Sequence, residues 1–151
     1  MARFRYRMQN ILDIKIKIEE QERIALGIAQ AELLDEQKNL QDLMIRRADY
    51  ERQLKELAQG TIRIADIKLC KRSIDAMKSK IRDQMIAVAR AQKNVDAARR
   101  RLNEVMQERK MHESLKDKAF MEFLEEEKKA ESKAIDELVS FTYGNSQEEE
   151  V

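Results

Sequence analysis

The second half of the chain carries a heptad pattern that leaves few folds open to it. Starting at Ile67 and advancing by three and four residues in turn, eleven of the fourteen positions are apolar. Six heptads of this kind exceed the three or four that indicate a coiled coil. The positions are Ile67, Cys70, Ile74, Met77, Ile81, Gln84, Val88, Ala91, Val95, Ala98, Leu102, Val105, Arg109 and His112.

A second apolar stripe runs through the first half of the chain, with less regular spacing. The step from Ala29 to Leu33 is four residues where three are expected, and such an insertion locally unwinds a supercoil. We therefore expect looser packing in this half. The stripe comprises Phe4, Met8, Ile11, Ile18, Ala25, Ala29, Leu33, Leu40, Met44, Leu54 and Ala58.

One break separates the two patterns. The chain has no Pro and three Gly, and Gly60 can adopt the left-handed conformation that ends a helix. A short connection between long helices favours antiparallel neighbours. We predict an all-α fold, in which helices over about 3–58 and 65–141 form a single antiparallel coiled-coil hairpin across a turn at 59–64. Residues 144–151 read as a disordered acidic tail.

The two predicted helices differ in length, so the second one overhangs the first. A hairpin folded at Gly60 brings Phe4 near residue 118 and leaves some twenty residues of the second helix without a partner. Exposed apolar area of this kind marks an interface. The overhang carries Phe120, Met121, Phe123, Leu124, Ile135, Leu138, Val139 and Phe141.

Charge is distributed unevenly, although the formal net charge is only +1. Residues 71–110 contain twelve Lys or Arg and five Asp or Glu, whereas residues 119–151 contain three and ten. Two readings remain open: unequal solvated helix faces, or a basic docking surface and an acidic tail. Acidic residues alternate with the basic ones throughout, which argues against a nucleic-acid-binding region.

Residues typical of catalysis, metal binding or cofactor binding are scarce. His112 and Cys70 are the sole histidine and cysteine, and both lie on the seam, where packing is their expected role. The sequence contains no Cys/His cluster and no Gly-rich phosphate loop. We expect no enzyme activity, no metal and no cofactor. Because no signal peptide or membrane-spanning run is evident, we expect a soluble, cytoplasmic protein.

Three sequence segments resemble the FliJ family of flagellar export proteins. The start, Phe4-Arg5-Tyr6-Arg7-Met8-Gln9-Asn10-Ile11-Leu12-Asp13, is similar to the aromatic-basic opening of that family. Tyr50, a Gly near the turn and a second helix beginning around Ile67 match its centre. Residues 109–118, Arg-Lys-Met-His-Glu-Ser-Leu-Lys-Asp-Lys, resemble its basic C-terminal segment, with His112 and Ser114 departing from the usual Leu and Lys. Asp136-Glu137 also fits.

The resemblance implies a function. FliJ proteins are two-helix coiled coils that bind the hexameric export ATPase FliI, promote its assembly and activity, and contact the export gate protein FlhA; some also handle export chaperones. The resemblance places the protein at the cytoplasmic face of the inner membrane, held there through its partners. The candidate ATPase-binding residues, at the end with both termini, are Arg3, Arg5, Arg7, Lys110, Lys116 and Lys118. The candidate gate-binding residues are Leu43, Tyr50 and Met77, with Tyr50 expected off the stripe as an outward anchor.

Two alternative functions stay open. A generic structural coiled coil would form a homodimeric rod with a continuous helix through Gly60. A stalk or stator subunit of another ATPase or secretion system would share the hairpin and differ in its partner.

Overall fold

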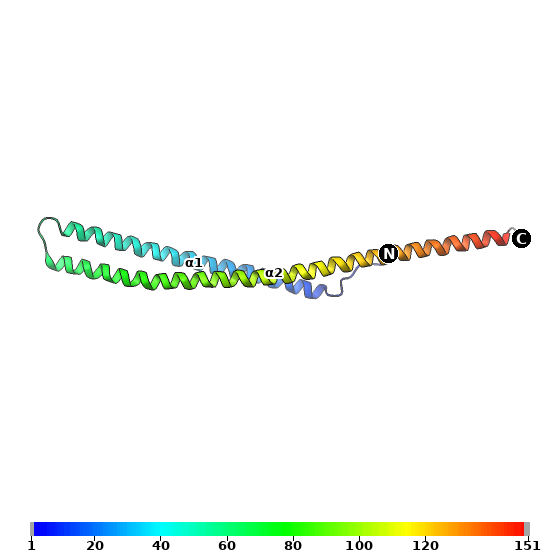
Figure 1. The fold of residues 1–151 in the computed structure, drawn as a ribbon, viewed down its shortest axis with the longest axis horizontal. Coiled ribbons are helices and arrows are strands. Elements are labelled where there is room, and N and C mark those ends of the chain that lie inside the picture. Colours follow the sequence, from blue (N-terminus) through cyan, green and yellow to red (C-terminus); the bar gives the residue numbers. More distant parts are fainter. Residues whose placement is uncertain (1, 150–151) are drawn as a thin grey trace. The chain divides into compact units, whose positions relative to one another are not determined.

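The computed structural model describes residues 2–149, which fold into two long α-helices (Figure 1). Helix α1 spans Gln9–Leu57 and helix α2 spans Ile64–Glu149. Within the described range no residue is in a β-strand. The two helices pack against each other, so the predicted all-α hairpin is confirmed.

The helical hairpin divides into two compact units. Unit 1 contains the chain up to Glu19 together with Val105 onward, and unit 2 is Glu20–Glu104. In both, a stretch of α1 faces a stretch of α2. Unit 2 includes the turn and contains most of the buried apolar residues.

The seam of α2 follows its predicted heptads. All fourteen predicted positions are buried or half-buried, from Ile67 to His112. In unit 2, Val95 and Ala98 are buried to 1% exposure and pack with Ala29, while Leu26 and Leu33 flank this cluster. Small side chains at this layer let the two backbones approach closely, so the core is a narrow strip between two helices.

The seam of α1 is displaced in part from the predicted stripe. Ile18, Ala25, Ala29, Leu33, Leu40 and Leu54 are buried or half-buried as predicted. Met8, Ile11, Met44 and Ala58 were predicted to face inward, but all four are exposed. The buried and half-buried positions instead advance by three and four without interruption, so the predicted insertion before Leu33 is wrong. The observed seam is Leu12, Lys15, Glu19, Glu22, Leu26, Ala29, Leu33, Glu36, Leu40, Leu43, Arg47, Tyr50, Leu54 and Leu57.

The displacement has a physical cause in polar seam positions on both helices. In unit 2, the side-chain amide of Gln84 donates to the main-chain carbonyl of Glu36 at 2.9 Å and also contacts the Glu36 carboxylate. Arg101 pairs with Glu22 at 3.6 Å. These groups satisfy one another across the interface, which allows a charged residue to occupy a position that an apolar pattern would exclude.

The connection between the helices is built around Gly60. Its φ of +80° is the only positive φ among the described residues, and an L side chain would be strained there. The main-chain N–H of Ala58 still bonds to the carbonyl of Leu54 at 3.2 Å, closing the last turn of α1. Helix α2 then restarts at Ile64, one residue before the predicted position, with Asp66 in its first turn, where a negative charge is favourable.

The structure differs from the prediction at both ends of the chain. Helix α1 begins at Gln9 rather than near residue 3, because residues 3–6 lie outside any helix and Arg7 and Met8 form a turn, closed by the bond from the Gln9 N–H to the Tyr6 carbonyl at 3.1 Å. Helix α2 continues to Glu149, so residues 144–149 of the predicted disordered tail are helical. Gly144 does not take a positive φ, and the Ser146 hydroxyl donates to the Thr142 carbonyl within the helix. Residues 150–151 of that tail lie outside the described residues.

Candidate functional site

An extended segment at the N-terminus, residues 3–7, lies along α2 in unit 1. Its side chains alternate as they do in a strand, where successive residues point to opposite sides. Phe4 and Tyr6 are half-buried, whereas Arg3, Arg5 and Arg7 are exposed. The alternation therefore presents all three arginines to solvent; we refer to residues 3–7 as the arginine segment.

Aromatic contacts hold the arginine segment in place. The ring of Phe4 lies 5.1 Å from that of Phe120 in an edge-to-face arrangement and 5.4 Å from that of Phe123, centroid to centroid. Such pairs stabilise by about 0.5–1.5 kcal/mol beyond their area burial. The hairpin was predicted to bring Phe4 near residue 118, and the ring lies about one turn of α2 from there.

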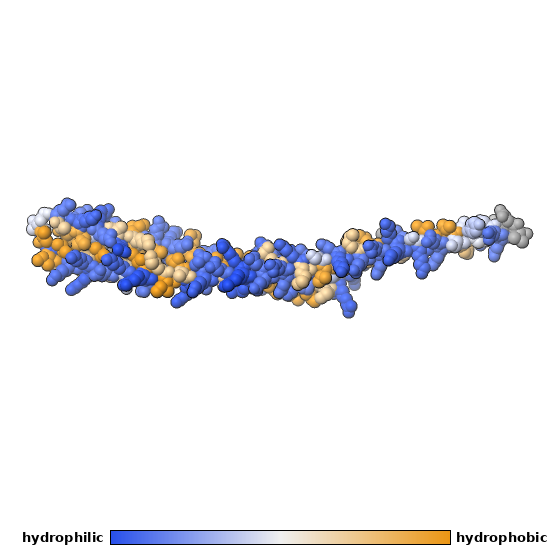
Figure 2. Space-filling model, viewed as in Figure 1, coloured by the Kyte–Doolittle hydropathy of each residue, from blue (hydrophilic) through white to orange (hydrophobic). Residues whose placement is uncertain are grey.

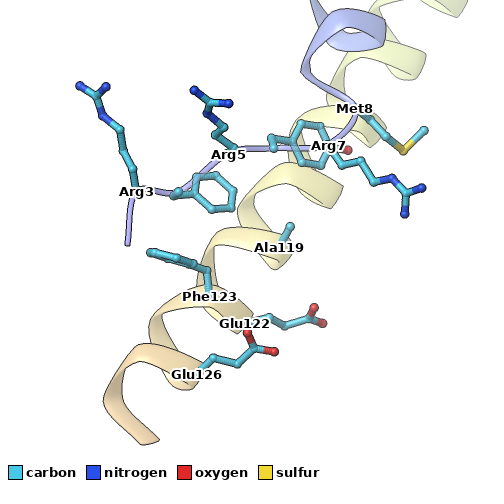
Figure 3. A pocket seen from close by; sticks show the side chains of 10 residues that line it. Arg3, Arg5, Arg7, Met8, Ala119, Glu122, Phe123 and Glu126 are labelled. Carbon is cyan, nitrogen blue, oxygen red and sulfur yellow. The ribbon is translucent and has the colours of Figure 1, made fainter. Parts of the chain in front are cut away.

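A shallow groove of about 460 Å³ runs between the arginine segment and α2 (Figure 3). Arg3 and Arg5 extend away from α2, while Glu122 and Glu126 project from the helix. The three candidate arginines and these two glutamates line the same groove. The candidate lysines do not line this groove: Lys110 and Lys118 are exposed elsewhere in unit 1, and Lys116 is half-buried on the seam.

A group of ion pairs replaces apolar contacts in the seam of unit 1. Lys15 pairs with Glu108 at 2.7 Å, and Arg109 pairs with both Glu19 and, at 2.9 Å, Glu113. Glu19 is buried, and the side chain of Arg109 is 19% exposed. This group of ion pairs was not predicted from the sequence, because the seam was identified by its apolar residues. The signal was the arginine on the predicted α2 seam, since a half-buried cation needs an acidic partner.

These contacts shift two pKa values. The hydrogen bond from Lys15, followed by its positive charge, lowers the pKa of Glu108 below its ordinary value. Hydrogen bonds to Glu113 and then to Glu19 raise the pKa of Arg109. Both shifts favour the charged forms, so the group remains an ionic layer at neutral pH.

The candidate gate-binding residues all lie on the seam in unit 2. Tyr50 was expected to point outward, but it is half-buried, as is Leu43, and Met77 is buried. The Cys70 thiol donates to the main-chain carbonyl of Tyr50 at 3.2 Å. Tyr50 and Leu69 also line a surface cavity of about 250 Å³ close to the turn. A partner at this end would therefore reach Tyr50 through the cavity, and Met77 serves packing.

The C-terminal part of α2 has no covering element. Every residue from 128 to 148 is exposed. Phe120 and Phe123 were predicted to belong to this overhang, but both contact Phe4, so the uncovered part begins further along α2 than predicted. Hydrophobic residues lie among hydrophilic ones along this stretch (Figure 2). The large apolar side chains here are Ile135, Leu138, Val139, Phe141 and Tyr143.

Within residues 2–149, the structure contains neither a metal-binding cluster nor a membrane-spanning segment. No group of three or more His, Cys, Asp or Glu is arranged to hold a metal ion. Neither helix has, in its described part, a segment apolar and long enough to traverse a bilayer.

Comparisons with known proteins agree with the sequence resemblance. The family model described as "Flagellar FliJ protein" matches residues 4–148. A solved structure described as a homologue of YscO, CT670 from Chlamydia trachomatis, is similar in fold, with a TM-score of 0.59 at 21% identity; the match covers 97% of this chain and 99% of the other. No curated protein matches. Since the family model covers nearly all of the sequence, the chain belongs to the FliJ family of flagellar export proteins.

Proposed function

We propose that this protein is a non-enzymatic coupling component of the flagellar export apparatus. In this proposal unit 1 binds the hexameric export ATPase FliI and promotes its assembly and activity, and the turn end of unit 2 contacts the gate protein FlhA. The protein acts at the cytoplasmic face of the inner membrane, held there by these partners. Membership of the FliJ family supports a role in flagellar export, and the two contacts are our assignment.

The arginine segment is the observation that carries the proposal. Three guanidinium groups alternate with two aromatic anchors, so the cations are displayed on a backbone that α2 holds in place. Alternate residues of an extended chain are about 7 Å apart, so Arg3 and Arg5 can each pair with a separate carboxylate on an acidic protein surface. Charges at the rim of an interface chiefly accelerate encounter and fix orientation.

The lysines and the overhang have distinct roles in this proposal. Lys110, Lys116 and Lys118 add positive charge to the same unit without lining the groove. The uncovered residues 128–148 supply the apolar area that a stable complex requires. The arginine segment then orients the complex and the overhang contributes most of its affinity.

Purified FliI provides the test. Addition of this protein is expected to raise ATP hydrolysis and ring formation. A variant with Arg3, Arg5 and Arg7 changed to Glu is expected to bind more slowly and to need a higher concentration for the same stimulation. The matched control reverses three exposed basic residues of unit 2, Lys78, Lys80 and Arg82, and should behave as the parent protein. No stimulation by the parent protein would refute ATPase coupling, and equal loss in both variants would refute the assignment to the arginine segment.

The gate contact has its own test. The Tyr50→Ala variant removes the ring that lines the cavity near the turn and is expected to weaken capture of the cytoplasmic part of FlhA. Tyr143→Ala, at an exposed tyrosine in unit 1, is the control and should retain binding. Unchanged capture by Tyr50→Ala would remove this residue from the contact.

A further inference from the structure

A stripe of isoleucines on α1 lies beside the ionic layer of unit 1. Ile11, Ile14 and Ile18 are spaced by three and four residues; Ile11 and Ile14 are 39% and 56% exposed, and Ile18 is half-buried. Each isoleucine directly precedes a seam residue (Leu12, Lys15 or Glu19), so the stripe flanks the interface with α2. Unit 1 thus has an apolar stripe, partly open to solvent, next to a seam that includes charged residues.

The heptad register extends this stripe onto α2. Met111 and Leu115 occupy the positions of α2 that flank the seam on the same side and at the same level, and both are exposed. The acceptor patch, as we name it, comprises Ile11, Ile14, Ile18, Met111 and Leu115. An apolar patch on two adjacent helices is a surface on which a third helix can pack.

A second apolar stripe lies on the uncovered end of α2. Ile135, Leu138 and Val139 occupy positions i, i+3 and i+4, and Leu138 is 69% exposed. Thr142, whose hydroxyl donates to the Leu138 carbonyl at 2.9 Å, follows at i+7 and extends this donor stripe to about 10 Å along the helix, the same length as Ile11 to Ile18. The two stripes therefore match in length, and three of the four donor positions are apolar.

The segments that carry the two stripes also have opposite charge. Residues 2–18 contain five Lys or Arg and one Asp, whereas residues 134–151 contain five Asp or Glu and no Lys or Arg. Opposite net charges favour encounter between these segments and disfavour contact of either one with its own copy. Charge thus selects the donor stripe as the occupant of the acceptor patch.

The two stripes of one molecule are too far apart to meet. Helix α2 is continuous from Leu115, which belongs to the acceptor patch, to Ile135, which begins the donor stripe. Twenty residues of α-helix span about 30 Å, so the donor stripe cannot turn back without breaking α2. The occupant must come from another molecule.

We propose that two copies of this protein exchange their C-terminal helices, the donor stripe of each packing on the acceptor patch of the other. In this dimer the two α2 helices run antiparallel. Leu115 of each copy lies level with Ile135 of the other, so the numbers of facing residues add up to about 250. Both contacts then form under one two-fold axis, and the assembly closes as a dimer. The proposal does not depend on ATPase binding, although the dimer would cover the overhang that our proposed FliI complex uses.

Sedimentation velocity of the full chain over a range of concentrations tests the dimer. The expected result is a concentration-dependent species of twice the mass of one chain, 17.8 kDa, that dissociates in high salt as the charges are screened. Ile14→Glu and Leu138→Glu should each abolish it. Their controls, Ile45→Glu and Leu34→Glu, change residues of similar exposure (53% and 63%) outside both stripes and should dimerise as the parent does. Circular dichroism confirms that each variant is folded.

Mixing the two variants makes the test specific to exchange. In an equimolar mixture of Ile14→Glu and Leu138→Glu, the intact donor stripe of the first can pack on the intact acceptor patch of the second. One of two contacts is then restored, and a mixed dimer weaker than the parent dimer is expected. A monomeric parent protein, a dimer that survives both substitutions, a mixture that stays monomeric, or larger species that grow with concentration would each overturn the proposal.

Discussion

Truncation of Val95 tests whether the narrow apolar layer of unit 2 stabilises the hairpin. Val95 is 1% exposed and packs against Ala29 and Ala98. Val95→Ala removes two buried carbons, a loss of about 1.6 kcal/mol at 0.8 kcal/mol for each. The cavity that remains adds to this loss, and the better helix propensity of Ala returns about 0.5 kcal/mol. The net decrease in the free energy of unfolding should be about 1.5–2 kcal/mol.

Urea denaturation followed by far-UV circular dichroism measures this decrease. Ile86→Ala is the control, because Ile86 is 60% exposed on the same helix and its truncation should change stability by less than about 0.5 kcal/mol. An unchanged slope with denaturant concentration would show that the transition itself is the same in both variants. If the two substitutions lowered stability equally, Val95 would not be in a packed interface and the seam would be misassigned.

Three further predictions concern the ionic layer and the turn. Changing Glu19 to Met removes one of the two carboxylates that pair with the half-buried Arg109, and changing both residues to Met removes this cation too, so Glu19→Met should be less stable in urea than the double variant. Because Lys15 lowers the pKa of Glu108 in the folded protein, this pair contributes stability above the ordinary carboxyl pKa of 4.5 and loses it as the pH falls below that value. Lys15→Met should therefore flatten the acid limb of a stability-pH curve. Gly60→Ala should cost about 1 kcal/mol, because an L residue is strained at a φ of +80°.

Each of these predictions has a contrasting measurement. Gly27 lies within α1 with open space around it, so Gly27→Ala should stabilise by about 0.5–1 kcal/mol where Gly60→Ala destabilises. Stabilisation by both substitutions would argue against the left-handed turn. A double Met variant less stable than Glu19→Met would mean that the ion pair is strongly net favourable. An acid limb unaffected by Lys15→Met would place the titrating group elsewhere.

The second helix was predictable from sequence because its seam is apolar. Residues such as Ile74, Ile81 and Val95 repeat with heptad spacing and are buried as expected. Gly60 likewise marked the turn, since few other residues adopt a positive φ without strain. In these places local preference and tertiary packing require the same residue types.

The first helix was less predictable because its seam is partly polar. Ile11 and Ile18 were predicted to be buried, but Ile11 is exposed and Ile18 only half-buried, and the neighbouring Leu12 and Glu19 are the buried residues. The choice between these two stripes depends on which charges the other helix presents, and an apolar pattern does not contain that information. The same reason explains why Tyr50 was expected outside the interface.

The extended conformation of residues 3–7 was a further feature that helical periodicity did not predict. Aromatic and basic residues alternate with a period of two, which is the period of an extended chain. Because Phe4, Met8 and Ile11 have helical spacing, residues 3–7 were predicted to belong to the first helix instead. The three arginines were proposed as binding residues from the sequence, whereas the groove they share with Glu122 and Glu126 became evident only from the structure.

The ion pairs of unit 1 fix the register between α1 and α2, and with it the residues of α2 that face the arginine segment. Alanine and valine pack against a facing helix at several offsets with similar energy, so they discriminate poorly between alignments. A slide of seven residues would leave Lys15 opposite a leucine or another cation in place of Glu108. The observed alignment satisfies these charges, and it thereby sets which part of α2 lies beside the start of α1 and the arginine segment that precedes it.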